Sequence, residues 1–150
     1  MLNLLSAVRL SAARSLLFRA LVLVLIALSL SACTEPPYTN LDNAGLKALL
    51  QQGVPVYDIR RPDEWRQTGV VEGSQRLTFV DGSGRLMPDF FTRFSAAVGK
   101  DDPVILICRT GNRSSVLGKH LMEKMGYTKV YNVRDGIVSW IGDRQKVVRL

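Results

Sequence analysis

Cysteine and histidine are scarce in this 150-residue sequence, which contains two cysteines and one histidine. A structural zinc site takes four such ligands, so we expect no metal ion in this protein. The glycine-rich segment 81–84 lacks the G-x-G-x-x-G spacing of a dinucleotide site, and we expect no other cofactor. The basic residues form no run interleaved with aromatic side chains, which argues against a nucleic-acid partner.

Acidic residues are absent from residues 1–34, whereas Arg9, Arg14 and Arg19 make the beginning of this region basic. An apolar stretch follows, and its charge-free part is shorter than the roughly 17–25 residues that a membrane-spanning helix needs. A basic head before a short apolar segment is typical of a secretory signal peptide, which we predict for residues 1–32.

The apolar stretch ends in Leu30-Ser31-Ala32-Cys33, which resembles the lipobox of bacterial lipoproteins. This resemblance implies that Cys33 is lipidated and becomes the first residue of the mature protein. We therefore expect a lipid-anchored protein of the bacterial cell envelope that faces the periplasm or the outer surface, with the lipid membrane as a partner through Cys33. The alternative is an ordinary signal peptide cleaved after Ala32, which would leave Cys33 as a free thiol.

The segment 33–40 contains two prolines and no apolar periodicity, so we predict a tether there. The remaining residues, 41–150, suffice for one small domain. Helical and strand patterns alternate along it, which predicts an α/β fold with a small parallel sheet flanked by helices on both faces. The predicted helices are 42–52, 62–67, 88–98 and 114–125, and the predicted strands are 54–59, 70–71, 77–80, 104–107 and 130–133.

Cys108 follows the uninterrupted apolar run 104–107, which is typical of a parallel strand buried on both faces. The next residues are polar or small and lead into the predicted helix 114–125. Backbone N–H groups, a helix N-terminus and two guanidinium groups stabilise negative charge, which favours a thiolate and an anionic ligand. We therefore predict Cys108 as the catalytic nucleophile. The predicted binding residues are Arg109, Thr110, Gly111, Asn112 and Arg113.

A lone cysteine at the end of a strand is most often an inert apolar residue. The loop favours a functional residue instead, because a structural cysteine has no need of arginine at both 109 and 113 with Gly111 between them. If Cys33 is lipidated, Cys108 also has no disulfide partner in an exported protein. An unpaired thiol in an oxidising compartment points to function.

The loop resembles the C-x-x-G-x-R-S active-site segment of the rhodanese family, which is matched by Cys108, Gly111, Arg113 and Ser114. In this family the cysteine carries a persulfide. The resemblance therefore implies that residues 109–113 bind the substrate and the persulfide.

A second rhodanese motif, D-x-R-x-x-x-E-[FYW], is matched by Asp58, Arg60, Glu64 and Trp65. An aspartate beside an arginine at a strand end is more often an ion pair that stabilises the fold than a catalytic group. We predict Asp58 and Arg60 as supporting residues for that reason.

Two further segments depart from the family's pattern. Gly136 and Trp140 match the closing G-G-x-x-x-W element, but Asp135 replaces its first glycine. The stretch 69–74 lacks the histidine and proline of the family's G-H-I-P-G-A segment. That segment mainly shapes a turn, so its loss affects the local backbone more than the chemistry.

The resemblance implies a rhodanese-like domain at 41–150 with thiosulfate sulfurtransferase-like activity. Cys108 would take sulfane sulfur from a small anionic donor such as thiosulfate and pass it to a thiol or cyanide acceptor. One alternative is a non-enzymatic persulfide carrier or a module that binds an unknown protein partner. The other is a phosphatase or arsenate reductase, but related phosphatases have a C-x5-R loop. Four residues separate Cys108 from Arg113, and this tighter ring suits one added sulfur atom.

Overall fold

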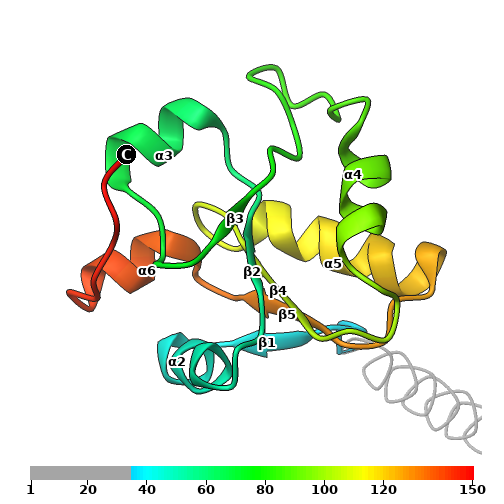
Figure 1. The fold of residues 1–150 in the computed structure, drawn as a ribbon, viewed down its shortest axis with the longest axis horizontal. Helices are drawn as coiled ribbons and strands as arrows, with labels where there is room; N and C mark the ends of the chain where they lie inside the picture. The colour runs from blue at the N-terminus through cyan, green and yellow to red at the C-terminus, as the bar shows by residue number, and fades with distance from the viewer. Residues whose placement is uncertain (1–34) are drawn as a thin grey trace, which may run out of the picture. The chain divides into compact units, whose positions relative to one another are not determined.

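The computed structural model describes residues 35–150, in which five strands form one sheet in the order β1-β5-β4-β2-β3 (Figure 1). Every pair of neighbouring strands is parallel. The strands are β1 (Thr39–Leu41), β2 (Val56–Asp58), β3 (Gln75–Arg76), β4 (Val104–Ile107) and β5 (Val130–Val133). The helices are α2 (Asn43–Gln51), α3 (Pro62–Thr68), α4 (Phe90–Ala97), α5 (Asn112–Met125) and α6 (Gly136–Gly142). The predicted α/β fold with a parallel sheet is confirmed.

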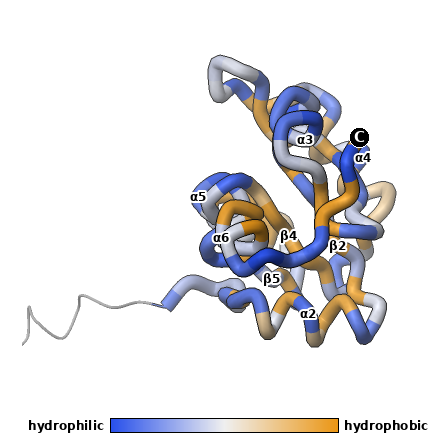
Figure 2. The backbone as a smooth tube through the Cα atoms, turned by 90° about the vertical axis from the view of Figure 1, so that its left-hand side faces the viewer, coloured by the Kyte–Doolittle hydropathy of each residue, from blue (hydrophilic) through white to orange (hydrophobic). Residues whose placement is uncertain are grey.

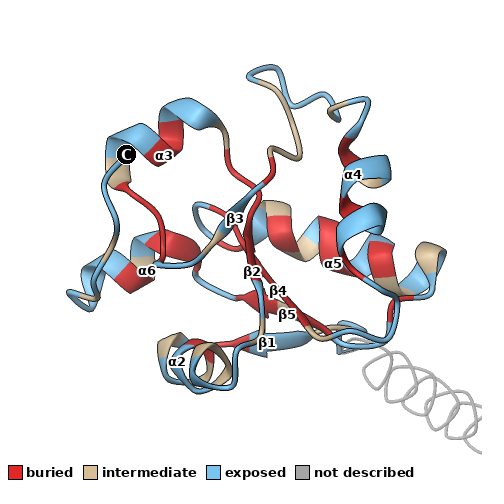
Figure 3. Ribbon diagram, viewed as in Figure 1, coloured by how far each residue is buried: buried red, intermediate tan, exposed pale blue. Residues whose placement is uncertain are grey.

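The central strand β4 packs against a hydrophobic cluster on each side, because its successive side chains point to opposite faces of the sheet. Val104 and Leu106 join a cluster that includes residues of α4 and α5. Ile105 and Ile107 join a second cluster that includes residues of α2 and α6. Buried residues follow the strands and the inner sides of the helices (Figure 3), and the central strands are also hydrophobic in sequence (Figure 2). Helices therefore cover both faces, as predicted.

The structure corrects the predicted tether at its carboxyl end, because the ordered sheet already includes Thr39 and Asn40 in β1. These residues pair with Tyr131 and Asn132 of β5. Just before them, Tyr38 packs against the α4 and α5 cluster, and its hydroxyl is hydrogen-bonded to Ser115. β1 is an edge strand with two exposed residues, so it lacks the apolar pattern by which a buried strand is recognised.

The predicted strand 77–80 is also corrected. Regular pairing with β2 is confined to Gln75–Arg76, although the N–H groups of Leu77 and Phe79 still donate to the carbonyls of Asp58 and Ile59, each at 3.1 Å. The chain then leaves the sheet in a hairpin turn that an antiparallel bridge between Val80 and Leu86 closes.

Other elements also differ from the predictions. The predicted strand 70–71 lies outside the sheet, where Val70 pairs antiparallel with Val148. Helix α5 begins at Asn112, two residues earlier than predicted. Helix α6 was expected only as a motif and is a regular element. Within residues 35–150, no helix is both long enough and apolar enough to span a membrane.

Candidate active site

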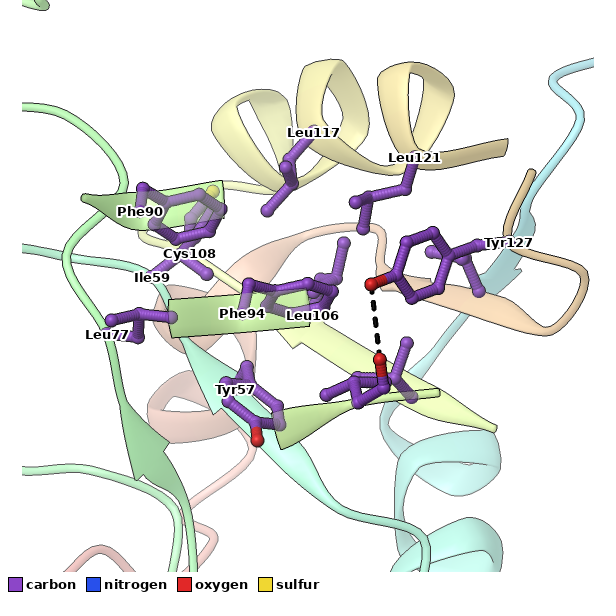
Figure 4. Packing of buried hydrophobic residues seen from close by; sticks show 13 residues of the cluster. Tyr57, Ile59, Leu77, Phe90, Phe94, Leu106, Cys108, Leu117, Leu121 and Tyr127 are labelled. Atoms are coloured by element: carbon purple, nitrogen blue, oxygen red, sulfur yellow. Dashed lines mark hydrogen bonds between the residues drawn. The ribbon is translucent and has the colours of Figure 1, made fainter. Parts of the chain in front are cut away.

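Cys108 directly follows β4 and lies at the carboxyl edge of the sheet, where parallel α/β folds place their ligand sites. Its side chain is buried in the same cluster as Ile59, Phe90 and Leu117 (Figure 4). Only 1% of the residue is exposed. The Ser114 hydroxyl lies 3.3 Å from the Cys108 sulfur and 3.1 Å from the carbonyl oxygen of Gly111. The sulfur is therefore held beside the first turn of α5.

The loop after Cys108 leaves a run of backbone donors free. Within residues 35–150, no protein acceptor takes a hydrogen bond from the N–H groups of residues 109–114. The first N–H groups of a helix point back along its axis, here from α5 toward the loop. Unpaired donors at the start of a 14-residue helix favour a bound anion or an anionic sulfur atom.

Two glycines allow this loop to pack closely on the turn between β5 and α6. Gly111 has φ +85°, and a Cβ atom there would overlap the backbone carbonyl of Arg134. Gly136 has φ +62°, and a Cβ atom there would overlap the backbone of Arg109 and Thr110. The N–H of Ile137 donates to the carbonyl of Cys108 at 2.9 Å, which ties the loop to the start of α6.

Arg113, which the sequence predicted as a substrate-binding cation, forms a fork-shaped ion pair with Glu64 of α3. Its two terminal nitrogens donate to the two carboxylate oxygens of Glu64 at 2.6 and 2.8 Å. The Glu64 side chain is 6% exposed and that of Arg113 is 24% exposed. The guanidinium group thus fixes the end of the loop to α3. The sequence marked Glu64 through its motif, but it did not reveal this pairing.

The surroundings of this ion pair shift the pKa of each partner in the direction that favours its charged form. Burial disfavours ionisation of Glu64, but hydrogen bonds from Arg113 and from the Arg61 N–H outweigh it, and the pKa of Glu64 lies below its usual value. The hydrogen bond to Glu64 raises the pKa of Arg113 against the opposing effect of burial, and the charge of Glu64 adds to this increase. Arg113 therefore supplies a permanent positive charge near the sulfur.

Asp58 and Arg60 form a second, fully buried ion pair at the end of β2. The Arg60 guanidinium donates to the Asp58 carboxylate at 2.8 and 2.6 Å, and it also donates to Thr68 and to the carbonyl of Gly69. Both side chains are at most 1% exposed. These contacts join β2 to α3, which carries Glu64, so the pair acts on the loop through the position of that helix.

Arg109 differs from Arg113 in that its guanidinium group is exposed. Arg109 is exposed, and in the part of the chain described by the structure its side chain has no hydrogen bond or ion pair. It lines a small pocket of about 90 Å³ together with Arg60 and Val138. Thr110 and Asn112 are also exposed, while Gly111 is buried. The loop therefore presents Arg109 to solvent, while Gly111 lies inside the protein.

Three further predictions concern Cys33, a metal ion and His120. Cys33 lies outside the described residues. In the range 35–150, no three side chains of histidine, cysteine, aspartate or glutamate are gathered as a metal ion would require. His120 is exposed on α5 and its ring lies 5.0 Å from that of Phe91, so it is not paired with Cys108 as a protease base would be.

Comparisons with known proteins agree with this geometry. The family model of the rhodanese-like domain matches residues 42–143. A thiosulfate sulfurtransferase GlpE from Tolumonas auensis is 29% identical over 104 residues, which are 69% of this chain and 88% of that protein. A sulfurtransferase from Allochromatium vinosum is 35% identical over 89 residues, or 59% of this chain and 73% of that protein.

The fold is also similar to that of solved structures. The polysulfide-sulfur transferase homodimer from Wolinella succinogenes has a TM-score of 0.61 and 21% sequence identity, over 76% of this chain and 80% of that chain. At this identity the likeness concerns the fold.

Proposed function

The chain belongs to the rhodanese-like domain family, and we propose that it is a sulfurtransferase that moves sulfane sulfur through a persulfide on Cys108. The observation that carries this proposal is the run of N–H groups at residues 109–114 that have no acceptor among residues 35–150 and lie next to a nearly covered sulfur atom. Such donors can hold one added, anionic sulfur atom without any rearrangement of the protein.

In the first step, the Cys108 thiolate attacks the outer sulfur of thiosulfate. A bond forms between the two sulfur atoms, the bond from the outer sulfur to the sulfonate sulfur breaks, and its electron pair leaves with sulfite. Cys108 then carries an anionic persulfide, and no external oxidant or reductant is needed. The N–H groups of the loop stabilise the negative charge on the outer sulfur as it develops.

In the second step, the acceptor attacks the outer sulfur and the Cys108 thiolate is released. With cyanide the product is thiocyanate. With a thiol, the acceptor first passes its proton to the anionic persulfide. Its thiolate then attacks, the product is the acceptor's persulfide, and the proton stays on the transferred sulfur. Charge and electrons balance in both cases.

The two arginines of the loop have different roles in this proposal. Arg109 is exposed and unpaired within the described residues, so it attracts the anionic donor. Arg113 is bound to Glu64, so it shapes the loop and contributes a fixed positive charge. Asp58 and Arg60 support the position of α3.

Intact mass spectrometry after incubation with thiosulfate tests the proposal. The protein should gain the mass of one sulfur atom, and cyanide should remove it as thiocyanate. The Cys108→Ser variant should do neither, because a hydroxyl group cannot replace the thiolate as the sulfur carrier. If the wild-type protein gained no sulfur but hydrolysed an aryl phosphate through Cys108, the assignment to sulfur transfer would be wrong.

We also propose that the domain is held at a membrane of the bacterial cell envelope by lipid on Cys33. A basic, acid-free head, a short apolar stretch and the sequence Leu30-Ser31-Ala32-Cys33 support this proposal. A single acyl chain binds membranes only marginally, so stable attachment calls for more than one chain.

A further inference from the structure

A second, larger pocket is lined by residues of the same loop but not by Arg109. Its volume is about 570 Å³, and it lies between the hairpin turn that follows Phe79 and the first turns of α5. Asn112 and Arg113 belong both to the catalytic loop and to the wall of this pocket. The pocket therefore shares two residues with the loop that would hold a persulfide on Cys108.

One side of this pocket is apolar. Phe79 and Val80 contribute from the hairpin, and Val116 contributes from α5. The Phe79 ring is fixed by edge-on packing on Phe90, at 4.9 Å between ring centroids. Val116 is 64% exposed, the largest exposed fraction among the large hydrophobic residues of the described chain. Together these three apolar side chains form a wall that an apolar ligand can cover.

The wall of the pocket also carries charged groups. The guanidinium groups of Arg61 and Arg113 both lie in its wall, and both are close to the single buried carboxylate of Glu64. Asp63 also pairs with Arg61, but its side chain is 61% exposed. Asp81 of the hairpin lines the pocket as well, and its carboxylate is already engaged by Ser83 and Arg85. The charges of these groups balance, and Arg61, at 32% exposed, is the better exposed of the two guanidinium groups in the wall.

We infer that this pocket binds the sulfur acceptor, and that the acceptor class it fits is an organic thiol with an apolar body and a carboxylate. The inference rests on the proposed function, because it needs a persulfide on Cys108. Thiosulfate and cyanide are compact and have no apolar body, so neither would use the wall formed by Phe79, Val80 and Val116. An apolar thiol in the pocket would bury this wall and place its carboxylate near Arg61.

The chemistry is the second step described above, with the thiol held next to the loop. Its thiolate forms a bond to the outer sulfur of the protonated persulfide, and the bond between the two persulfide sulfurs breaks. The electron pair of that bond returns to Cys108 as thiolate, and the organic persulfide leaves with the proton.

The test measures how fast preloaded protein loses its added sulfur to different acceptors. The protein is loaded with thiosulfate, desalted, mixed with 2-mercaptobenzoate, 2-mercaptoethanol or cyanide, and followed by intact mass spectrometry. Val116→Ser should slow transfer to 2-mercaptobenzoate about fivefold because apolar contact area is lost. Val116→Trp, which obstructs the pocket, should slow it at least tenfold. Transfer to cyanide should change less than twofold in both variants.

Matched variants separate the pocket from general effects. Ile141 is a β-branched, 37% exposed residue of α6 that does not line the pocket, so Ile141→Ser and Ile141→Trp should leave all rates unchanged. Arg61→Gln should slow transfer to 2-mercaptobenzoate more than transfer to benzenethiol, which has no carboxylate.

Each result has a definite consequence. Equal rates for all acceptors in the Val116 variants, or equal slowing of all of them, would overturn the assignment of the pocket while leaving sulfur transfer intact. A wild-type protein that takes up no sulfur from thiosulfate would instead overturn the proposed function, and this inference with it.

Discussion

Arg113 donates hydrogen bonds of 2.6 and 2.8 Å to the carboxylate of Glu64, a residue that precedes it by 49 positions in the chain. The cation at the end of the loop that follows Cys108 is therefore partly neutralised by α3. The main role of Arg113 is therefore structural: it holds the end of the loop against α3. Its positive charge is a second contribution. In the proposed function, attraction of the anionic donor then depends more on the exposed Arg109.

Glu64→Ala should destabilise the protein strongly, because it leaves Arg113 partly buried without its partner. A loss of roughly 3 kcal/mol in the free energy of unfolding is expected, at the low end for a buried pair since Arg113 is 24% exposed. Urea unfolding measures it. Asp63→Ala removes an exposed ion pair of the same helix and should cost less than about 1 kcal/mol. Similar losses in the two variants would contradict the bracing role.

The contribution of Glu64 should also depend on pH. Its pKa is lower in the folded protein than its usual value of about 4.3, so the folded state binds fewer protons than the unfolded state in this range. Its stabilisation is complete above the unfolded pKa and is lost as the pH falls through the folded pKa. Urea unfolding of the wild type and of Glu64→Gln should thus differ most at neutral pH and converge in acid. A constant difference from pH 7 to pH 3 would exclude this linkage.

Arg109→Ala should raise the KM for thiosulfate about fivefold, because an exposed charged contact contributes roughly 1 kcal/mol at most. The free energy of unfolding should stay within about 0.5 kcal/mol of the wild type, since the side chain is exposed and unpaired in the described part of the chain. Steady-state kinetics and urea unfolding provide the two readouts. Arg93→Ala, which removes an exposed arginine from α4, is the matched control. Equal KM changes in both variants would reduce the role of Arg109 to general electrostatics.

The parts of the fold that the sequence predicted best are those with the strongest burial. All residues of Val104–Ile107 are buried, and this strand and Val130–Val133 have the predicted bounds. The edge strand Thr39–Leu41 was missed because it is held by backbone pairing and needs only one buried side chain. An edge strand need not show a run of apolar residues in its sequence, whereas a central parallel strand that is buried on both faces does.

The sequence predicted those parts of the candidate site whose residues lie close together in the chain. Cys108 and its loop could be recognised because a strand, a glycine and two arginines occur within a few residues of each other. The partner of Arg113 could not, because the pairing depends on where α3 lies in space. The pocket beside Val116 was missed for a related reason, since its hairpin and its helix are far apart in sequence.

Cys33→Ala should release the protein from membranes if Cys33 carries the lipid. The wild type should partition into the detergent phase and incorporate labelled fatty acid, and the variant should do neither. Cys108→Ser is the matched control, because it removes the other cysteine and should leave partitioning unchanged. A Cys33→Ala protein that is processed normally and stays equally membrane-bound would refute the lipid anchor.

Gly136→Ala should damage the catalytic loop from outside it. A Cβ atom at this position would overlap the backbone of Arg109 and Thr110, and φ is +62°, a conformation that costs a residue with a side chain roughly 1 kcal/mol or more. The loop can relieve the overlap only by moving away from α6, which disturbs the N–H groups that would hold the persulfide. Persulfide formation from thiosulfate should therefore slow at least tenfold, and urea unfolding should show a loss of stability. Gly142→Ala lies in the same helix with open space around its Cβ and should change neither measurement. If Gly136→Ala reacted with thiosulfate as fast as the wild type, close packing of the loop on α6 would not be required for sulfur transfer.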